Sequence, residues 1–437
     1  MPGNLCFCLN LARVLMRKAS LSIIFVTIFI DLLGFGIIIP IMPFYAEHFG
    51  ASATEIGMLA ASFSFMQFLF SPFWGRLSDR FGRRPVLLIS LAGSGFALMG
   101  VGFARSLTAL FVARACAGIF TANIATAQAY IADITSPENR ARGMGMIGAA
   151  FGLGFTFGPA IGGLLSDEAL LSSAERFLSL NAGISIDGLL SSNNLSIPSF
   201  AAAGLALLNT AAAFFFLPES LSMKKMANAR QEDAAPRVSR LKSFKIILSQ
   251  PIVGQFLVIF FLVTLAFTKM ETTYALMTER NFGFGPGENG YLFAFIGIVL
   301  SITNGLLIGP LTRRYGEKTL LPIGLLLQAL AFFFLPYSFS VTGLLIFSGI
   351  IAVGSGFSNP SLQSLISRSA ARDEQGLVLG FSHSLGSLAR IFGPLWGGFF
   401  FDKLGVPAPY LSGGIIILLG VWLSMRAASK FESSNAA

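Results

Sequence analysis

The sequence predicts an all-α membrane protein with twelve transmembrane helices arranged as two six-helix halves. Three observations predict this fold class. The mean hydropathy is +0.73 and only 12% of the 437 residues are charged, which excludes a soluble domain of this size. Twelve apolar runs are long enough to cross the roughly 30 Å hydrocarbon core of a bilayer. Two glycine-containing motifs recur at nearly the same spacing, as a duplicated six-helix unit would require.

The spans follow from the apolar runs taken in order. In the first half, 20–217, they are expected at 20–45, 54–78, 84–104, 107–133, 141–165 and 198–217. In the second half, 251–428, they are expected at 251–278, 288–310, 319–337, 341–367, 376–402 and 409–428. The remaining parts are two tails, a loop on the outside and a polar linker with seven basic residues: 1–19, 429–437, 166–197 and 218–250.

The distribution of basic residues orients these spans. With both termini in the cytoplasm, 23 of the 30 Lys and Arg residues lie in cytoplasmic segments, 4 lie outside and 3 lie within spans. This asymmetry is what the positive-inside rule demands. Because the net charge of +9 is spread over separate loops, no single basic patch is available for nucleic acid, and nucleic-acid binding is excluded.

The residues that most enzymes need are scarce. The chain has only two histidines, His48 and His383, and its three cysteines fit neither a disulfide framework nor a zinc site. Neither a nucleophile–base pair, a phosphate-binding loop nor a metal cluster is evident. We therefore expect no enzyme activity, no metal and no cofactor.

The two halves repeat. Gly158-Pro159-Ala160-Ile161-Gly162-Gly163 matches Gly393-Pro394-Leu395-Trp396-Gly397-Gly398, an offset of 393 − 158 = 235 residues. Gly75 in the hairpin after the second span matches Gly309 after the eighth, an offset of 309 − 75 = 234 residues. Since each repeat holds an even number of helices, the halves run parallel and are related by an axis along the membrane normal.

The hairpin between the second and third spans is expected to act as a conformational gate. Its sequence suits a tight cytoplasmic turn, because Gly75 allows close helix approach, Gly82 allows a reversal and the arginines mark the inner face. Topology leaves the acid Asp79 unexplained, and in the second repeat Arg313 takes its place. We expect Asp79 to dock at a helix N-terminus of the other half and Arg83 to pair with Asp133. The gating residues are Gly75, Asp79, Arg80, Gly82, Arg83, Arg84 and Asp133.

These motifs resemble those of the major facilitator superfamily. Gly75-x3-Asp79-Arg80-x-Gly82-Arg83-Arg84 resembles its signature hairpin, and Arg114 with Gly118 resembles its second motif. Gly154-x3-Gly158-Pro159-x2-Gly162-Gly163 resembles the motif typical of its antiporters, and the run 129–135 looks like the tetracycline/proton antiporter branch. The resemblance covers nearly the whole chain and implies alternating access.

Ionisable residues inside the predicted spans are candidates for proton coupling or substrate contact, because a charge at mid-bilayer is costly. In the first half these are Asp31 and Arg114. A carboxyl in apolar surroundings can bind and release a proton, and the family position of Arg114 implies a role in coupling. A structural partnership is the alternative for each, and the two could pair with one another.

The second half offers four more candidates. Lys269 and Glu271 are two residues apart and do not share a helix face, so each needs its own partner. His383 and Arg390 are seven residues apart and share one face. His383 is of the residue type that changes charge near neutral pH, although a lone histidine is more often structural.

The fifth span concentrates glycine. Small residues four apart let two backbones pack closely, and Pro159 can bend the helix. We expect the antiporter-type motif to make a close contact between the halves that seals one side of the protein. Its residues are Gly154, Gly158, Pro159, Gly162 and Gly163.

Together these features predict a proton-coupled secondary transporter that exports a small amphipathic compound, a drug or a metabolite, by alternating access. Tetracycline itself is disfavoured, because the third and ninth spans lack the acids that tetracycline antiporters carry there. The alternatives are proton-coupled or facilitative uptake of a sugar, organic acid or siderophore, and a non-transporting scaffold. The expected partners are a small-molecule substrate and membrane lipid, the energy source is the proton gradient, and the protein is expected as a monomer in a bacterial inner membrane.

Overall fold

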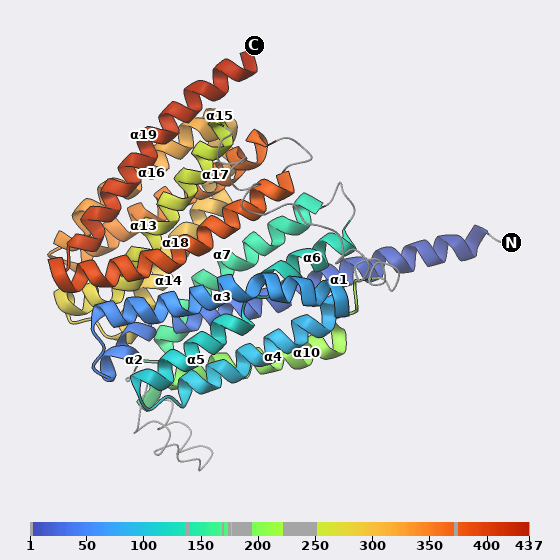
Figure 1. The fold of residues 1–437 in the computed structure, drawn as a ribbon, viewed down its shortest axis with the longest axis horizontal. Helices are drawn as coiled ribbons and strands as arrows, with labels where there is room; N and C mark the ends of the chain where they lie inside the picture. The colour runs from blue at the N-terminus through green and yellow to red at the C-terminus, as the bar shows by residue number, and fades with distance from the viewer. Residues whose placement is uncertain are drawn as a thin grey trace. The chain divides into compact units, whose positions relative to one another are not determined.

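A computed structural model describes residues 3–135, 140–167, 170–173, 176, 195–221, 251–370 and 375–436. Within these ranges every regular element is a helix (Figure 1). The contacts divide the chain into two compact units. The first comprises Met1–Ile39, Met66–Gly162 and Ser185–Ala235, and the second comprises Pro40–Phe65, Gly163–Ile184 and Pro236–Ala437.

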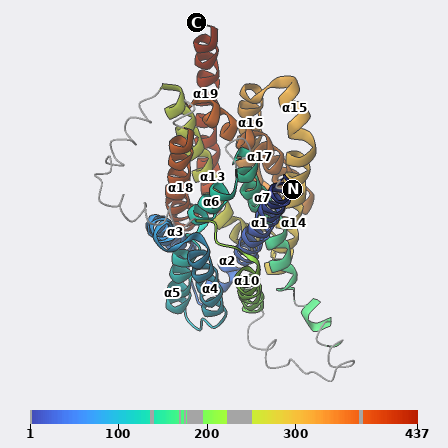
Figure 2. The ribbon, with the colours of Figure 1, turned by 90° about the vertical axis from the view of Figure 1, so that its right-hand side faces the viewer.

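The first unit is a helical bundle. Its helices are α1 (Gly3–Ile38), α4 (Arg83–Gly102), α5 (Leu107–Phe120), α6 (Ile124–Ile134), α7 (Arg140–Leu164, up to Gly162), α10 (Ile197–Phe216) and the part of α3 (Ala53–Phe81) from Met66 onward. Helix α10 packs against α4 and α1, and α4 packs against α5 (Figures 1 and 2). Close packing is possible because α10 presents small side chains such as Ala202 and Ala206, and the Asn209 amide donates to the Thr27 carbonyl at 2.9 Å.

The second unit is a larger bundle. Its elements are α2 (Met42–His48), α13 (Pro251–Phe282), α14 (Pro286–Ile302), the π-helix η2 (Thr303–Leu307), α15 (Ile308–Tyr315), α16 (Glu317–Phe334), the 3-10 helix η3 (Leu335–Tyr337), α17 (Val341–Ser369), α18 (Gln375–Leu404), α19 (Ala408–Ala436) and Ala53–Phe65 of α3. Helix α13 packs against α18 and α19, while α16 packs against α17 and α19. Gly324 and Gly354 bring α16 and α17 together, since a Cβ on either would lie 2.6 Å from the other's carbonyl oxygen.

The first predicted span, 20–45, is wrong at its end. Helix α1 stops at Ile38, and a short separate helix, α2, begins at Met42. Pro40 explains the break, because proline disfavours helical geometry in the residue before it and lacks the N–H of an intrahelical bond.

The fourth predicted span, 107–133, is interrupted. Helix α5 ends at Phe120, and α6 begins only at Ile124. The Thr121 hydroxyl donates to the Ala117 carbonyl at 2.8 Å, a bond of the kind that bends helices.

Side chains from α3 and α4 satisfy the carbonyls at this break. Trp74 donates to Ile119 at 2.6 Å, Gln67 donates to Thr121 at 3.2 Å, and Ser90 donates to Phe120 at 2.5 Å. The break is therefore built into the fold, since buried carbonyls need partners.

Eleven of the described helical stretches are long and apolar enough to cross a membrane, and α14, η2 and α15 together form one of them. Helix α18, which corresponds to predicted span 376–402, is 30 residues long but is not among the eleven. His383, Arg390 and three serines lie along its middle, and they lower its hydropathy. Apolar side chains such as Phe96 (64% exposed) and Phe215 (77% exposed) remain uncovered on other helices, as a lipid-facing surface requires.

Candidate functional site

Asp31 lies on α1, within the membrane-spanning part of that helix. Its Oδ2 accepts a hydrogen bond from the Asn123 amide, at 3.5 Å. Both side chains line a cavity of about 20 Å³, which has room for about one water molecule. Asn123 is the first residue before α6, so the break between α5 and α6 is what places an amide beside the carboxyl.

Arg114 is a buried arginine of α5, with 6% of its surface exposed. Its guanidinium carbon lies 6.0 Å from the centre of the Phe35 ring. Phe35 is one helical turn from Asp31 on α1, so the charge and the carboxyl approach the same stretch of that helix. Direct pairing of Asp31 with Arg114 stays a prediction.

Lys269 and Glu271 on α13 each have a separate partner, as their spacing predicts. Lys269 is fully buried, and its Nζ donates to Ser412 Oγ of α19 at 2.8 Å. The same ammonium lies 5.2 Å from the Trp396 ring and 5.8 Å from the Phe400 ring, in the range of cation–π attraction. The ammonium of Lys269 is therefore held by a hydroxyl and two aromatic rings on neighbouring helices.

Glu271 faces α18. Its carboxyl is attracted by the guanidinium of Arg390, which also acts electrostatically on His383. The predicted shared face of His383 and Arg390 is thus confirmed, and Glu271 is the acid that this face meets. The second unit therefore brings together an acid, a permanent cation and a histidine, whereas Asp31 and Arg114 belong to the first unit.

The predicted gating hairpin is built around Arg83. Its guanidinium lies 2.6 Å from Asp79 and 3.3 Å from Asp133 at the end of α6. It also donates to Ser78 Oγ at 2.6 Å. The predicted pairing of Arg83 with Asp133 is confirmed, while Asp79 here pairs with Arg83, and its docking at a helix N-terminus stays a prediction.

Glu219 completes this network, and its role was missed from the sequence. Its carboxylate accepts the backbone N–H of Arg83 at 2.9 Å and of Arg84 at 3.1 Å, at the start of α4. Free N–H groups at a helix start favour a negative partner. The signal was an acid directly after a proline at the end of the sixth span, in Leu217-Pro218-Glu219-Ser220.

The other hairpin residues divide by role. Gly82 has a φ of 106°, so the predicted tight reversal is confirmed. A Cβ placed on Gly75 would have no described atom of another element within 4 Å. The predicted close helix approach at Gly75 is therefore wrong. Arg84 donates to the Phe214 carbonyl and lies over the ring of the same residue, and exposed Arg80 lies over Phe81.

The glycine motif of α7 makes the close contact that its spacing predicts, but with a different partner. A Cβ on Gly158 would lie 2.6 Å from the Cα of Gly36, and one on Gly154 would lie 2.8 Å from the Cβ of Leu32. Gly162 meets the Ile37 carbonyl, and Pro159 approaches Gly36. The expected contact between halves is therefore wrong for these glycines, because α1 belongs to the same half. Only Gly163 meets the other half, at Gly290 of α14.

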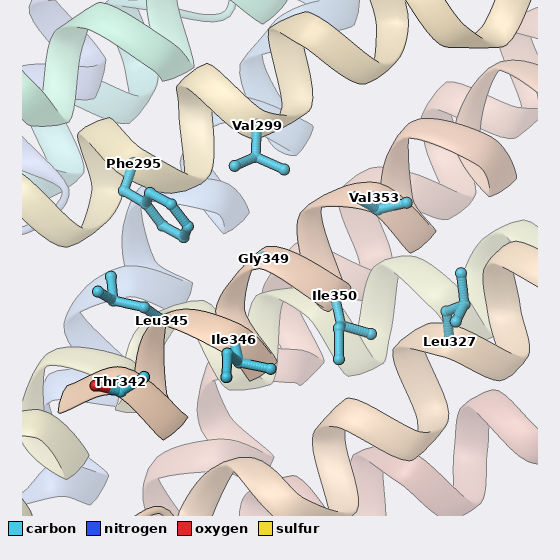
Figure 3. Close-up of a pocket in the computed structure, with 9 residues that line it drawn as sticks. All are labelled: Phe295, Val299, Leu327, Thr342, Leu345, Ile346, Gly349, Ile350 and Val353. Carbon is cyan, nitrogen blue, oxygen red and sulfur yellow. The ribbon is translucent and has the colours of Figure 1, made fainter. Parts of the chain in front are cut away.

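An apolar groove of about 390 Å³ lies between α14, α16 and α17 (Figure 3). Its lining is aliphatic and aromatic apart from Thr342 and Gly349, and it contains no ionisable side chain: Phe295, Val299, Leu327, Thr342, Leu345, Ile346, Gly349, Ile350 and Val353. This groove can take an apolar chain, but it offers nothing to bind a proton. The ionisable cluster of Glu271 and Arg390 is the better candidate for coupling.

Comparisons with known proteins agree with this geometry. The family model of the Major Facilitator Superfamily matches residues 24–308 and 272–436. Multidrug resistance protein 2 of Bacillus subtilis (strain 168) is 28% identical over 410 residues, which cover 94% of this chain and 95% of that protein. Tetracycline resistance protein, class C, of Escherichia coli is 33% identical over 380 residues, which cover 86% and 88%.

Solved structures share the fold. The crystal structure of the human organic anion transporter MFSD10 (TETRAN) aligns with a TM-score of 0.64 at 25% identity, over 93% of this chain and 99% of that one. A bacterial homologue of the human lysosomal transporter Spinster aligns with a TM-score of 0.73 at 15% identity, over 96% and 98%. The helices, the hairpin, the glycine motif and the family match agree, and the chain belongs to the Major Facilitator Superfamily, in the branch of its tetracycline and multidrug resistance proteins.

Proposed function

We propose that this membrane transporter exports a small amphipathic compound in exchange for protons, by alternating access, in a bacterial inner membrane. The observation that carries the proposal is a carboxyl within the apolar helices of each unit, with a polar partner on another helix. Asp31 has Asn123, and Glu271 has Arg390. Membrane-embedded carboxyls of this kind are the groups that bind and release protons in transporters.

The direction of transport is supported by the relatives. The printed names of two of them are multidrug resistance and tetracycline resistance proteins, and resistance by a transporter requires export. Uptake of a sugar, organic acid or siderophore is the alternative, and it predicts movement in the opposite direction under the same proton gradient.

The basic residues of the second unit favour a second substrate class, organic anions. Lys269 is fully buried, whereas Arg390 is exposed and is attracted by the carboxyl of Glu271. A structural neighbour at 25% identity is named as an organic anion transporter. An anionic group on an otherwise apolar substrate would find positive charge here, whereas a cationic drug would depend on Asp31 and Glu271.

The test uses inside-acid everted vesicles with ethidium as a cationic probe, and with fluorescein as an anionic one. We expect accumulation of one probe to fall at least tenfold in Asp31→Asn, while exchange without a gradient persists, because the coupling proton is lost and the substrate path is kept. Glu288→Gln is the control, since Glu288 caps its own helix, α14, by accepting from the Gly285 N–H. Equal accumulation by wild type and Asp31→Asn would overturn proton coupling through Asp31.

A further inference from the structure

Two short segments from the first half of the sequence pack in the second unit. These are Pro40–Phe65, which holds α2 and the start of α3, and Gly163–Ile184, which follows α7. Both lie on the face that the charge distribution assigns to the outside. Their contacts are therefore those that would have to break for the protein to open outward.

Asp402, at the end of α18, holds the start of α3. Its carboxylate accepts the backbone N–H of Thr54 at 2.7 Å and of Ala53 at 3.2 Å, and it also accepts the Thr54 hydroxyl. The first N–H groups of a helix lack intrahelical partners, and the positive end of the helix dipole adds to their attraction for a carboxylate. A carboxylate of the second repeat thus caps the N-terminal end of a helix from the first repeat.

The backbones beneath Asp402 touch. A Cβ on Gly57 would collide with the Pro394 carbonyl, and one on Gly398 would collide with the Ala53 carbonyl. The second copy of the glycine motif is therefore the surface on which the start of α3 packs.

The first copy of the motif has a related arrangement, in which the aspartate accepts a side-chain hydroxyl of the opposite helix and the N–H of Leu170 in its own segment instead of the N–H groups of the helix start. Gly163 meets Gly290 of α14, and Asp167 lies four residues further along. The Asp167 carboxylate accepts the Tyr291 hydroxyl at 3.1 Å, and a Cβ on Gly287 would lie 3.4 Å from it. Asp167 and Asp402 are related by the repeat, since 402 − 167 = 235, the offset of the glycine motifs. Each motif thus ends in an aspartate at the first turns of a helix from the opposite repeat.

A third contact on this face depends on a proton. The carboxyl of Glu47 on α2 lies within hydrogen-bonding reach of the carboxyl of Glu279 on α13, and two carboxyls can share a hydrogen bond only when one of them is protonated. Burial, with Glu279 as the next cause, raises the pKa of Glu47 from its ordinary 4.5 to about 8. Arg280, also on α13, opposes this shift, and on the α2 side the neighbouring His48 is exposed.

We propose that Asp402 and Asp167 are a repeat-related pair of latches that close the outer face, and that the Glu47–Glu279 pair makes this closure depend on an external proton. In the closed form the two glutamates hold one proton between them. Opening separates and hydrates them, and the proton is released to the outside. The proposal rests on the proposed exchange of substrate for protons, because it explains how an external proton returns the empty carrier to its closed form.

The expected sign follows from the two forms. Between pH 4.5 and about 8 the closed form binds more protons than the open one, so raising the pH favours opening. Below pH 4.5 the Glu47 carboxyl is protonated in both forms, and above about pH 8 it is ionised in both. The open-to-closed ratio is then independent of pH. One proton changes the open-to-closed ratio by at most about tenfold per pH unit.

The test measures a distance and needs no substrate. Spin labels are placed at Met58→Cys on α3 and Leu404→Cys on α18, two exposed positions outside the latch, after the three native cysteines are replaced by serine. Pulsed electron resonance between pH 4 and 9 is expected to show one short distance at low pH and a growing longer one as the pH rises. Glu47→Gln should remove this pH response and keep the short distance.

Two further variants separate the contacts. Asp402→Ala should raise the longer-distance population about tenfold at every pH, because the charged partner of the helix start is lost. Glu55→Gln is the matched control, since Glu55 bonds only to Ser52 within its own segment among the described residues. A distance that ignores pH in the wild type, while vesicles still exchange substrate for protons, would overturn the latch proposal alone. A pH-dependent distance without any proton-linked transport would instead overturn the proposed function.

Discussion

The two corresponding hairpins of the repeats, at Gly82 and Gly316, carry the same ion pair with opposite polarity. In the first, Arg83 lies 3.3 Å from Asp133, and in the second, Glu317 lies 3.2 Å from Arg368. The positions are related by the repeat, since 317 − 83 = 234 and 368 − 133 = 235. Each pair ties the residue after the hairpin glycine, Gly82 or Gly316 with its positive φ, to the end of a later helix. Both repeats thus link the hairpin to a later helix by an ion pair, and the acid and the base exchange places between the two repeats.

The surroundings of the two pairs differ. The side chains of Arg83 and Asp133 are 10% and 12% exposed, whereas those of Arg368 and Glu317 are 60% and 20% exposed. Arg83 also binds Asp79, and Glu219 receives the N–H groups behind it. In the second hairpin Glu317 also accepts the Ser364 hydroxyl, at 3.0 Å, and a backbone N–H. Among the described residues, the first pair is the less exposed one and has a second acid beside its arginine, which is where a gating role would be expected.

The largest effect is expected from Arg83→Ala. Removing one partner of a largely buried pair leaves Asp133 uncompensated, which costs roughly 3 kcal/mol. The apparent unfolding temperature in detergent would measure it, with Arg80→Ala as the control because Arg80 is exposed. Equal shifts for the two variants would show that the network does not stabilise the hairpin.

Exchanging the charges sharpens the comparison. The double variant Arg83→Glu with Asp133→Arg gives the first hairpin the polarity of the second, and we expect it to recover about half of the loss seen in either single variant. Recovery stays incomplete because the new glutamate would face Asp79. The same unfolding measurement on the two single variants and the double variant gives the coupling energy. If the double variant unfolds at the same temperature as the single variants, the first hairpin requires an arginine at 83 and an acid at 133, and an ion pair of the opposite polarity does not replace them.

A smaller effect is expected from Glu219→Ala, which removes the acceptor at the start of α4. Loss of such a cap costs about 1 kcal/mol. Hydrogen exchange at the Arg83 and Arg84 amides should rise about fivefold. Ser220→Ala is the control, since its hydroxyl only reaches Asp133 at 3.5 Å. Unchanged exchange at these amides would contradict the cap.

The smallest effect is expected from Arg368→Ala. An ion pair with one mostly exposed partner contributes less than about 1 kcal/mol. The change in unfolding temperature should therefore be several times smaller than that of Arg83→Ala, and it should vanish in high salt. A loss as large as that of Arg83→Ala would show that the two hairpins are equivalent after all.

Repetition made much of this fold predictable from the sequence. The apolar runs place most helices to within a few residues, although α1 begins at Gly3 and α19 ends at Ala436, and the offset of 235 residues relates the glycine motifs. Arg83 and Asp133 have opposite charge and lie at the same predicted ends of the third and fourth spans, which allowed their pairing to be predicted. In each case the signal is local or is repeated along the chain.

What could not be predicted depends on partners far away in the sequence. The break at Thr121 is stabilised by Trp74, Gln67 and Ser90, and no proline marks it. The capping of α4 by Glu219 joins positions 136 residues apart. The reversed ion pair of Glu317 could not be predicted from the hairpin alone, because its partner Arg368 lies 51 residues further along the chain.

The interruption of the fourth span has a mechanical consequence. Helices α5 and α6 contain 14 and 11 residues, so they are rods of about 21 Å and 17 Å, joined by a turn over residues 121–123. Arg114 lies on one rod and Asp133 on the other. Because Trp74, Gln67 and Ser90 hold the carbonyls at the joint, the two rods meet at a fixed bend, and Arg114 and Asp133 therefore lie on separate helical axes.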